Sequence, residues 1–198
     1  GIKSKLDPVI SLCLGPVEVS VSEMVDAYTT FVNKGIKVDP LYVTRIEDNK
    51  GNVISSFTPQ YTEIISEETS HKMLEMLKAV INEGTGVRLR YRYQFKGDIG
   101  GKTGTTQNNS DGWFIGVTPG LVSGTWVGGE DRSIHFDNLR EGQGASMALP
   151  VWALYMQKVY ADETLGYSDT LKFDIPEHLQ KEYKECVSNE VVEDLLFN

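Results

Sequence analysis

Cysteine, histidine and long apolar runs are scarce in this sequence, and each scarcity excludes a class of protein. The 198 residues contain 2 cysteines and 3 histidines. Cys13 and Cys186 are too far apart for a zinc or redox motif, and His71, His135 and His178 are scattered, so neither a disulfide framework nor a metal site is predicted. No apolar run approaches the roughly 18 residues that a membrane-spanning helix requires.

Basic residues are outnumbered as well. The 19 Lys and Arg residues stand against 28 Asp and Glu, which gives a formal net charge of -9. Recognition of a phosphate backbone requires a basic face, so no nucleic-acid partner is expected. Ten acidic and three basic residues lie between Asp162 and Asn198, so the acidic excess is concentrated at the end. The sequence begins at Gly1 without a Met or a signal peptide, so the chain is either cytosolic or located by a segment upstream of it.

Three segments carry helix signals. Ser20 and Glu23 have the spacing of a capping box, in which each side chain satisfies a backbone donor of the other residue. Apolar residues follow at helical spacing, and Gly35 is suited to end this helix at the C′ position. Ser66 is a candidate N-cap for a second helix. The predicted helices span residues 20–32, 66–83 and 146–160, with a further solvated helix from Pro176.

Strand signals fill the segments between these helices. Residues 48–52 are typical of a hairpin turn between strands at 42–47 and 53–57. Residues 87–96 alternate apolar or aromatic with basic side chains, which predicts an extended, half-buried segment. Three more strands are predicted with short connections, which require antiparallel neighbours: residues 102–106, 112–117 and 121–128. The predicted fold is therefore α/β of the α+β type, an antiparallel sheet flanked by helices.

The segment from Gly97 to Gly116, GDIGGKTGTTQNNSDGWFIG, carries the chemistry. Its Gly101-Lys102-Thr103 suggests a phosphate-binding loop. That pattern needs a glycine five residues before Gly101, where Lys96 stands, and a helix after it, so the phosphate-loop interpretation fails. The alternative is a Lys-Thr-Gly strand at a sheet edge beside a cleft.

In such a strand, Lys102 supplies a fixed positive charge, and Thr103 and Thr105 present hydroxyl groups on one face. Gly104 leaves room for a ligand to approach the backbone. This set suits an anionic, amide-like substrate, whose carboxylate is held by hydroxyl groups and whose carbonyl meets a backbone N–H. Taken as three letters alone, Lys-Thr-Gly is better explained as an unliganded surface strand, so the sequence around it decides.

That surrounding sequence is distinctive. Lys102 to Pro119, KTGTTQNNSDGWFIGVTP, resembles the third motif of the class A (bifunctional) penicillin-binding proteins and the hairpin after it. The resemblance continues in order over residues 1–161, through Leu14 to Ser20, Ala27-Tyr28, Phe31 to Gly35, Glu83 to Gly86, Thr125 to Gly128 and Pro150 to Trp152. It assigns residues 1–161 to the C-terminal portion of a penicillin-binding transpeptidase domain, with a fold like that of the serine β-lactamases and without the N-terminal half. Residues 162–198 are left as an acidic tail.

The resemblance implies serine acyl transfer on peptidoglycan stem peptides that end in D-Ala-D-Ala, with β-lactams as mimics of that end and with no cofactor. Lys102 is then expected to set the electrostatics of the cleft, and Thr103 and Thr105 to bind the carboxylate. The N–H of Thr105 is expected to be one of two oxyanion-hole donors. Lys102 and Thr105 are therefore the catalytic candidates, and Gly104 and Thr103 complete the substrate-binding set.

The family also implies an upstream glycosyltransferase domain. It places the parent protein at the extracytoplasmic, periplasmic face of the bacterial inner membrane, and its only contact with the membrane is an upstream anchor that this sequence lacks.

The sequence departs from the family pattern because two of its three motifs are missing. No serine is followed three residues later by lysine, and no Ser-x-Asn occurs. The nucleophile is therefore expected upstream of Gly1, in the missing half of the domain, and the isolated chain is expected to be inactive. Two alternatives stay open: a serine β-lactamase or penicillin-sensing receptor of the same fold, and a non-catalytic cell-wall binding module.

Overall fold

A three-stranded antiparallel sheet forms the centre of the molecule, for which the computed structural model describes residues 1–179. Strands β5 (Gly100–Thr105), β6 (Asp111–Thr118) and β7 (Leu121–Gly128) lie side by side in chain order. The three strands predicted from the sequence are thus confirmed, with the antiparallel pairing that their short connections require. Strand β5, which carries the Lys-Thr-Gly sequence, is an edge strand of this sheet.

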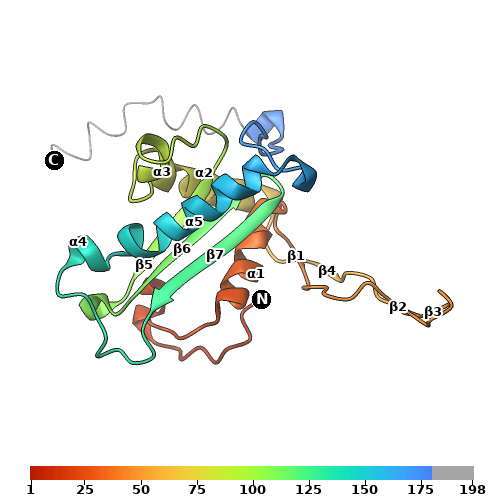
Figure 1. Cartoon of the computed structure of the whole chain (residues 1–198), viewed down its shortest axis with the longest axis horizontal. Coiled ribbons are helices and arrows are strands. Elements are labelled where there is room, and N and C mark those ends of the chain that lie inside the picture. The colour runs from red at the N-terminus through yellow and green to blue at the C-terminus, as the bar shows by residue number, and fades with distance from the viewer. Residues whose placement is uncertain (180–198) are drawn as a thin grey trace.

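Helices cover both faces of the sheet, which confirms the predicted fold class. Figure 1 shows α5 (Gly144–Ala161) lying across one face. The opposite face packs on α1 (Val21–Val32), where a Cβ added at Gly124 of β7 would lie 2.9 Å from a methyl group of Val25. Helix α2 (Glu67–Asn82) packs beside β5. The predicted helices are therefore present, and each lies where it can bury an apolar side.

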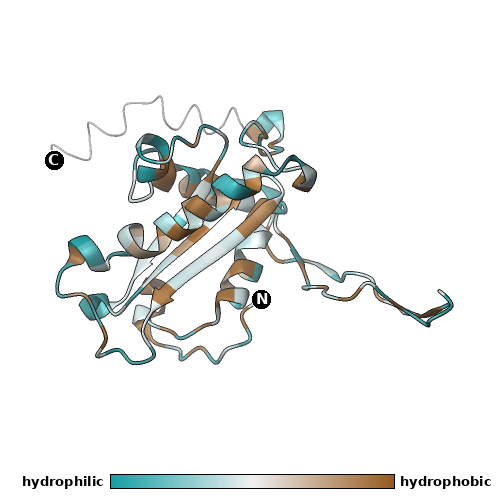
Figure 2. Ribbon diagram, in the orientation of Figure 1, coloured by the Kyte–Doolittle hydropathy of each residue, from teal (hydrophilic) through white to brown (hydrophobic). Residues whose placement is uncertain are grey.

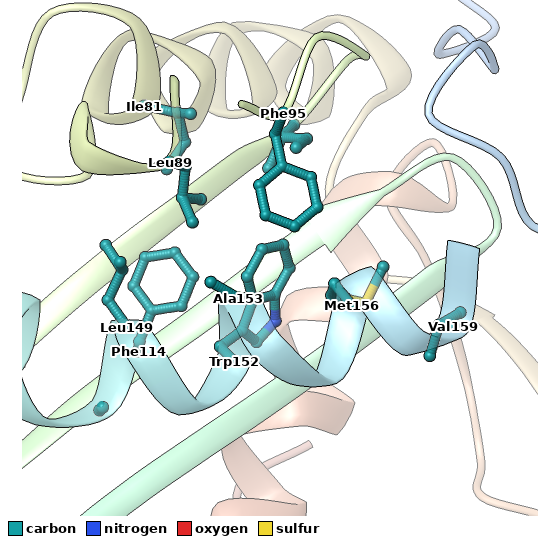
Figure 3. Packing of buried hydrophobic residues seen from close by; sticks show 11 residues of the cluster. Ile81, Leu89, Phe95, Phe114, Leu149, Trp152, Ala153, Met156 and Val159 are labelled. Carbon is teal, nitrogen blue, oxygen red and sulfur yellow. The ribbon is translucent and has the colours of Figure 1, made fainter. Parts of the chain in front are cut away.

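The main hydrophobic core lies between the sheet and α5. Trp152 of α5 stands at its centre, with its indole ring 5.2 Å from the ring of Phe114 on β6 in an edge-to-face arrangement. Phe95 packs on the other side of the indole, as Figure 3 shows. Edge-to-face contacts add to the stabilisation from burial of these large rings. This core fixes α5 against the strands that carry the candidate site.

The ends of α1 are set by local contacts. The capping box is present: the Ser20 hydroxyl accepts from the Glu23 N–H (3.2 Å), and the Glu23 carboxylate accepts from the Ser20 N–H (2.9 Å). At the other end, Lys34 and not Gly35 occupies the left-handed C′ position, with φ of 55°. Gly35 follows it at C″, and its N–H bonds the Thr30 carbonyl (2.9 Å), as in a Schellman motif. The prediction was therefore one residue off.

The extended segment predicted at residues 87–96 is wrong. The structure has a short helix, α3 (Arg88–Tyr91), followed by a turn with Gln94 at φ 61°. Leu89 and Phe95 are both buried in the main core, and a turn brings them together where a ten-residue strand would hold them apart. The alternating basic residues form no single face, because the Arg90 guanidinium bonds the carbonyls of Phe95 and Gly97 inside the turn.

A long two-stranded arm projects from the body, as Figure 1 shows. Near the body, β1 (Ile36–Val38) pairs with β4 (Tyr61–Glu63); farther out, β2 (Arg45–Glu47) pairs with β3 (Val53–Ser56). The predicted outer hairpin is confirmed, whereas the β1–β4 pair was not predicted. Figure 2 shows apolar residues along the arm, and Tyr42 and Ile54 are largely exposed. Four shorter helical segments complete the described elements: η1 (Ile10–Leu14), η2 (Gln107–Asn109), α4 (Leu139–Gly142) and η3 (Glu163–Leu165).

The chain after α5 returns to the body. Phe173 is buried against Leu74 and Leu77 of α2, and its N–H bonds the Asp98 carboxylate (3.2 Å). Most of the helix predicted from Pro176, together with Cys186, lies outside the described residues. Within residues 1–179, no helix combines the length and the apolar character needed to cross a membrane.

Candidate active site

The Lys-Thr-Gly-Thr residues occupy the second half of edge strand β5. Alternation along the strand places Thr103 and Thr105 on the face that packs on α5, and Lys102 and Gly104 on the other face. Lys102 and Thr105 are exposed, whereas Thr103 is only 9% exposed. The predicted site residues therefore share one strand, and the two threonines share one face, as expected.

Thr103 is held by the turn that follows α2. Its hydroxyl lies 2.7 Å from the hydroxyl of Thr85, in the Gly84-Thr85-Gly86 turn. Gly86 packs closely in this turn, since a Cβ there would lie 2.5 Å from the end of the Ile81 side chain and 3.2 Å from the Val80 carbonyl oxygen. Sequence reasoning noted the turn but not this contact, whose partners are 18 residues apart.

Thr105 is held by the start of α5. The backbone N–H of Gly144, the first residue of that helix, donates to the Thr105 hydroxyl oxygen (3.0 Å). The first N–H groups of a helix have no partner within it, so the threonine oxygen satisfies one of them. A Cβ on Gly144 would lie 2.2 Å from the Gly104 carbonyl oxygen, so only glycine lets α5 begin this close to β5.

Arg88 of α3 fixes the same end of α5. Its guanidinium donates to the Ala145 carbonyl (3.0 Å) and to the Ser146 hydroxyl (2.8 Å). The Ser146 hydroxyl in turn donates to the Arg140 carbonyl (2.7 Å). Arg88 therefore ties the turn after α2 to the helix end that contacts Thr105. No local sequence signal indicates this link, since its partners are 57 and 58 residues apart.

The opposite face of the strand carries the positive charge. The Lys102 ammonium group bends back to the β5 backbone and donates to the Thr103 carbonyl (2.6 Å). Gly104 lies across from Trp113 on β6, and a Cβ at Gly104 would be 3.1 Å from the Cβ of that tryptophan. The Cβ position of Gly104 therefore points toward Trp113, while its carbonyl lies against Gly144.

Asp111 lies at the start of β6, on the face opposite the two threonines. Its N–H donates to the Thr106 hydroxyl (2.9 Å), and its carbonyl accepts from the Thr106 N–H (3.1 Å), so it closes the turn between β5 and β6. Burial raises the pKa of the Asp111 carboxyl, an effect that nearby Thr106, Arg132 and Trp126 partly offset. Its position supports the role of a turn residue.

A cavity of about 50 Å³ lies between α1, α2 and residues 173–176, and its lining includes the buried His71. It includes no residue of the Lys-Thr-Gly strand and lies near the start of α2, whereas Thr85 follows the end of that helix. Among the described residues, no cluster of His, Cys, Asp and Glu side chains could hold a metal ion. The candidate site is therefore the edge strand of the sheet, with two hydrogen-bonded hydroxyl groups and an ammonium group.

Comparison with known proteins decides the family. Residues 3–126 match the penicillin binding protein transpeptidase domain, a span that includes the whole of β5 and β6. The chain belongs to this transpeptidase family. The class A type inferred from the sequence is shown as well, since the relatives include penicillin-binding proteins 1A and 1B.

Several curated relatives are similar over most of this chain. Penicillin-binding protein 1A of Aquifex aeolicus is 34% identical over 154 residues, which are 78% of this chain and 20% of that protein. Penicillin-binding protein 1A of Rickettsia conorii is 28% identical over 207 residues, which are 91% of this chain and 24% of that protein. The chain thus spans about a fifth to a quarter of the length of these relatives.

Solved structures show the same fold. Penicillin-binding protein 1A from Haemophilus influenzae superposes with a TM-score of 0.70 at 24% identity, over 84% of this chain and 29% of that one. PonA1 from Mycobacterium tuberculosis superposes with a TM-score of 0.65 at 23% identity, over 85% of this chain and 44% of that one. The chain therefore has the penicillin-binding transpeptidase fold, of which it contains a part.

Proposed function

We propose that this chain forms one wall of the active site of a peptidoglycan D,D-transpeptidase. The reaction is acyl transfer: a serine attacks the penultimate D-Ala carbonyl, terminal D-Ala leaves, and the acyl group passes to an amine of another stem peptide. The attacking serine and its activating lysine belong to a part of the parent protein that this sequence does not contain. Family membership supports this chemistry. The missing Ser-x-x-Lys motif supports the assignment of the nucleophile to another part of the parent protein.

The observation that carries the proposal is the arrangement of Thr103 and Thr105. Two hydroxyl groups on one face of an edge strand can donate together to a carboxylate, such as that of D-Ala-D-Ala or of a β-lactam. Lys102, at the same strand, adds a positive charge that favours an anionic substrate. Gly104 keeps the backbone free of a side chain beside them, and the N–H of Thr105 serves as one oxyanion-hole donor.

We further assign residues 1–161 to the transpeptidase domain and residues 162–198 to an acidic tail, whose first part returns to the body at Phe173. The parent protein is placed at the periplasmic face of the bacterial inner membrane, with an anchor and a glycosyltransferase domain outside this chain. Relatives named penicillin-binding proteins 1A and 1B favour this assignment over a β-lactamase or a receptor.

Acylation by a fluorescent penicillin tests the proposal. The whole parent protein should label, and this chain alone should not. In the parent protein, Thr105→Val should lower the second-order acylation rate about 10- to 100-fold, because it removes a hydrogen bond to a charged group. Thr125→Val, on the same face of distant edge strand β7, is the control and should change the rate less than twofold. A covalent adduct on this chain alone, or an unchanged rate in Thr105→Val, would refute the proposal.

A further inference from the structure

The segment from Gly84 to Arg88 lies next to both threonines of the Lys-Thr-Gly strand, one directly and the other through the start of α5. Thr85 meets Thr103 directly, and Arg88 holds the end of α5 that meets Thr105. We propose that Thr85 and Arg88 are positioning residues, which orient the hydroxyl groups of Thr103 and Thr105 to donate to a substrate carboxylate. This inference rests on the proposed function and deepens it.

The Thr103 hydroxyl is oriented by its contact with Thr85. Each threonine hydroxyl has one proton, and the 2.7 Å contact between Thr85 and Thr103 uses one of the two. A carboxylate accepts only, so Thr103 can donate to it only when Thr85 is the donor in their mutual bond. The exposed Thr85 is free to take that role, whereas Thr103 is 9% exposed and fixed in the strand. Without the Thr85 hydroxyl, the oxygen of Thr103 loses its donor and its proton loses its preferred direction.

The Thr105 hydroxyl is oriented by the start of α5. Its oxygen already accepts from the Gly144 N–H at 3.0 Å, so its own proton is not used in that bond and can be donated to a ligand. This geometry lasts only while the first turn of α5 stays against β5. Arg88 holds that turn through Ala145 and Ser146, since one guanidinium nitrogen, Nη1, donates to both.

Thr103 and Thr105 are therefore held in a similar way. When a carboxylate is bound, a protein donor occupies each threonine oxygen, Thr85 at Thr103 and Gly144 at Thr105, and leaves the hydroxyl proton for the ligand. Preset donors bind an anion better than freely rotating hydroxyls, because less conformational freedom is lost on binding. Discrimination in favour of a carboxylate should therefore depend on Thr85 and Arg88, although neither is proposed to touch the substrate.

The experiment uses the whole parent protein, with benzylpenicillin and its methyl ester as the two probes. Thr85→Val keeps the shape of the side chain and removes the hydroxyl, and should lower the acylation rate by benzylpenicillin about tenfold, the effect of one lost hydrogen bond. The rate with the ester should change less than twofold, because the ester lacks the anionic acceptor. Thr85→Ser retains the hydroxyl and should restore the benzylpenicillin rate.

Arg88→Gln provides an independent test, with Arg92→Gln, at the C-cap of the same short helix, as its control. Arg88→Gln should again slow benzylpenicillin selectively, whereas Arg92, whose guanidinium lies over the Tyr93 ring, should tolerate the change. An equal loss with both probes in Thr85→Val and Arg88→Gln would indicate a purely structural role and overturn the inference. Unchanged rates would overturn it too. A wild-type parent that penicillin does not acylate would instead refute the proposed function, and this inference with it.

Discussion

Close approach between elements depends on individual glycines. Gly144 allows α5 to begin against the Gly104 carbonyl, and Gly116 of β6 leaves the space that the Trp152 indole fills. Neither residue has a positive φ, so their role is space rather than backbone conformation. Gly35 combines both, with φ of 85° and a Cβ position 2.0 Å from the Ile65 carbonyl oxygen. Such contacts join residues distant in sequence, so composition alone does not indicate which glycines matter.

Replacement of Gly116 by alanine should destabilise the protein by about 1–3 kcal/mol, as expected for overpacking of a core. The new Cβ would lie 2.3 Å from two ring carbons of Trp152, a rigid group that is 1% exposed and hydrogen-bonded to Ser123. Gly124→Ala is the matched control in the same sheet: its Cβ meets methyl groups of aliphatic side chains, Ile115 at 2.7 Å and Val25 at 2.9 Å, which can shift more readily than an indole ring, so its cost should be smaller. Urea unfolding of both variants measures the difference, and equal costs would contradict this account.

The candidate site shows how far residue-level reasoning from the sequence extends. The Lys-Thr-Gly run and the shared face of Thr103 and Thr105 follow from strand alternation, and the structure agrees on that placement. The contacts of these hydroxyls with Thr85 and Gly144 could not be predicted, because they depend on the packing of a turn and a helix end against β5. The catalytic and binding roles of these residues stay predictions.

Among the elements, those with local signals were predicted best. Ser20 and Ser66 cap α1 and α2 as their spacing indicates, and the Asp48 carboxylate accepts from the N–H groups of Lys50 and Asn52 in the hairpin turn. The β1–β4 pair was missed because its three-residue strands lie far apart in sequence. The error at residues 87–96 has a similar cause, since tertiary packing of Leu89 and Phe95 overrides a period-two pattern.

Helix α1 also anchors the beginning of the chain, and this contact should make stability depend on pH. The Glu23 carboxylate accepts from the N–H groups of Ser20, Lys3 and Ser4 and from the Ser4 hydroxyl. These hydrogen bonds, that from the Ser20 backbone first, hold the pKa of Glu23 well below its usual value. A lowered folded-state pKa gives stability that is complete above the unfolded value, about 4.3, and that is lost as pH falls through the folded value.

Glu23→Gln should therefore lower the melting temperature at pH 7 and reduce the further loss between pH 5 and pH 3. The control is Glu18→Gln, which also removes a carboxylate, just before the start of α1. The Glu18 carboxylate forms an ion pair with Arg132 at the exposed surface, and such pairs contribute little to stability. Thermal unfolding monitored by circular dichroism across this pH range gives both curves. If the Glu23→Gln and wild-type curves are parallel from pH 7 to pH 3, the carboxylate clamp does not contribute as described.

At the scale of the whole molecule, the fold class was predictable because antiparallel neighbours and amphipathic helices leave few arrangements. The side on which the candidate site lacks a partner was harder to predict. Strand β5, which carries Lys-Thr-Gly, pairs with β6 alone in the sheet, so its other edge is unpaired there. Acyl transfer needs a nucleophile, its base and an oxyanion hole converging on one carbonyl. The proposed function thus requires a second wall that docks against β5.

Reconstitution from two separate polypeptides should reveal that second wall. When this chain is mixed with the part of the parent protein that carries Ser-x-x-Lys and Ser-x-Asn, a fluorescent penicillin should label that other polypeptide and not this one, since the acyl bond forms on its serine. A Thr103→Val/Thr105→Val version of this chain should reduce the labelling rate of the mixture at least tenfold, because two donors to the carboxylate are lost. An Ile54→Ser version, altered in the projecting arm, serves as the matched control and should support full labelling. A denaturing gel separates the two polypeptides by mass, and in-gel fluorescence shows which of them is labelled. Labelling of the other polypeptide that is equally fast without this chain would show that β5 is not a wall of the site.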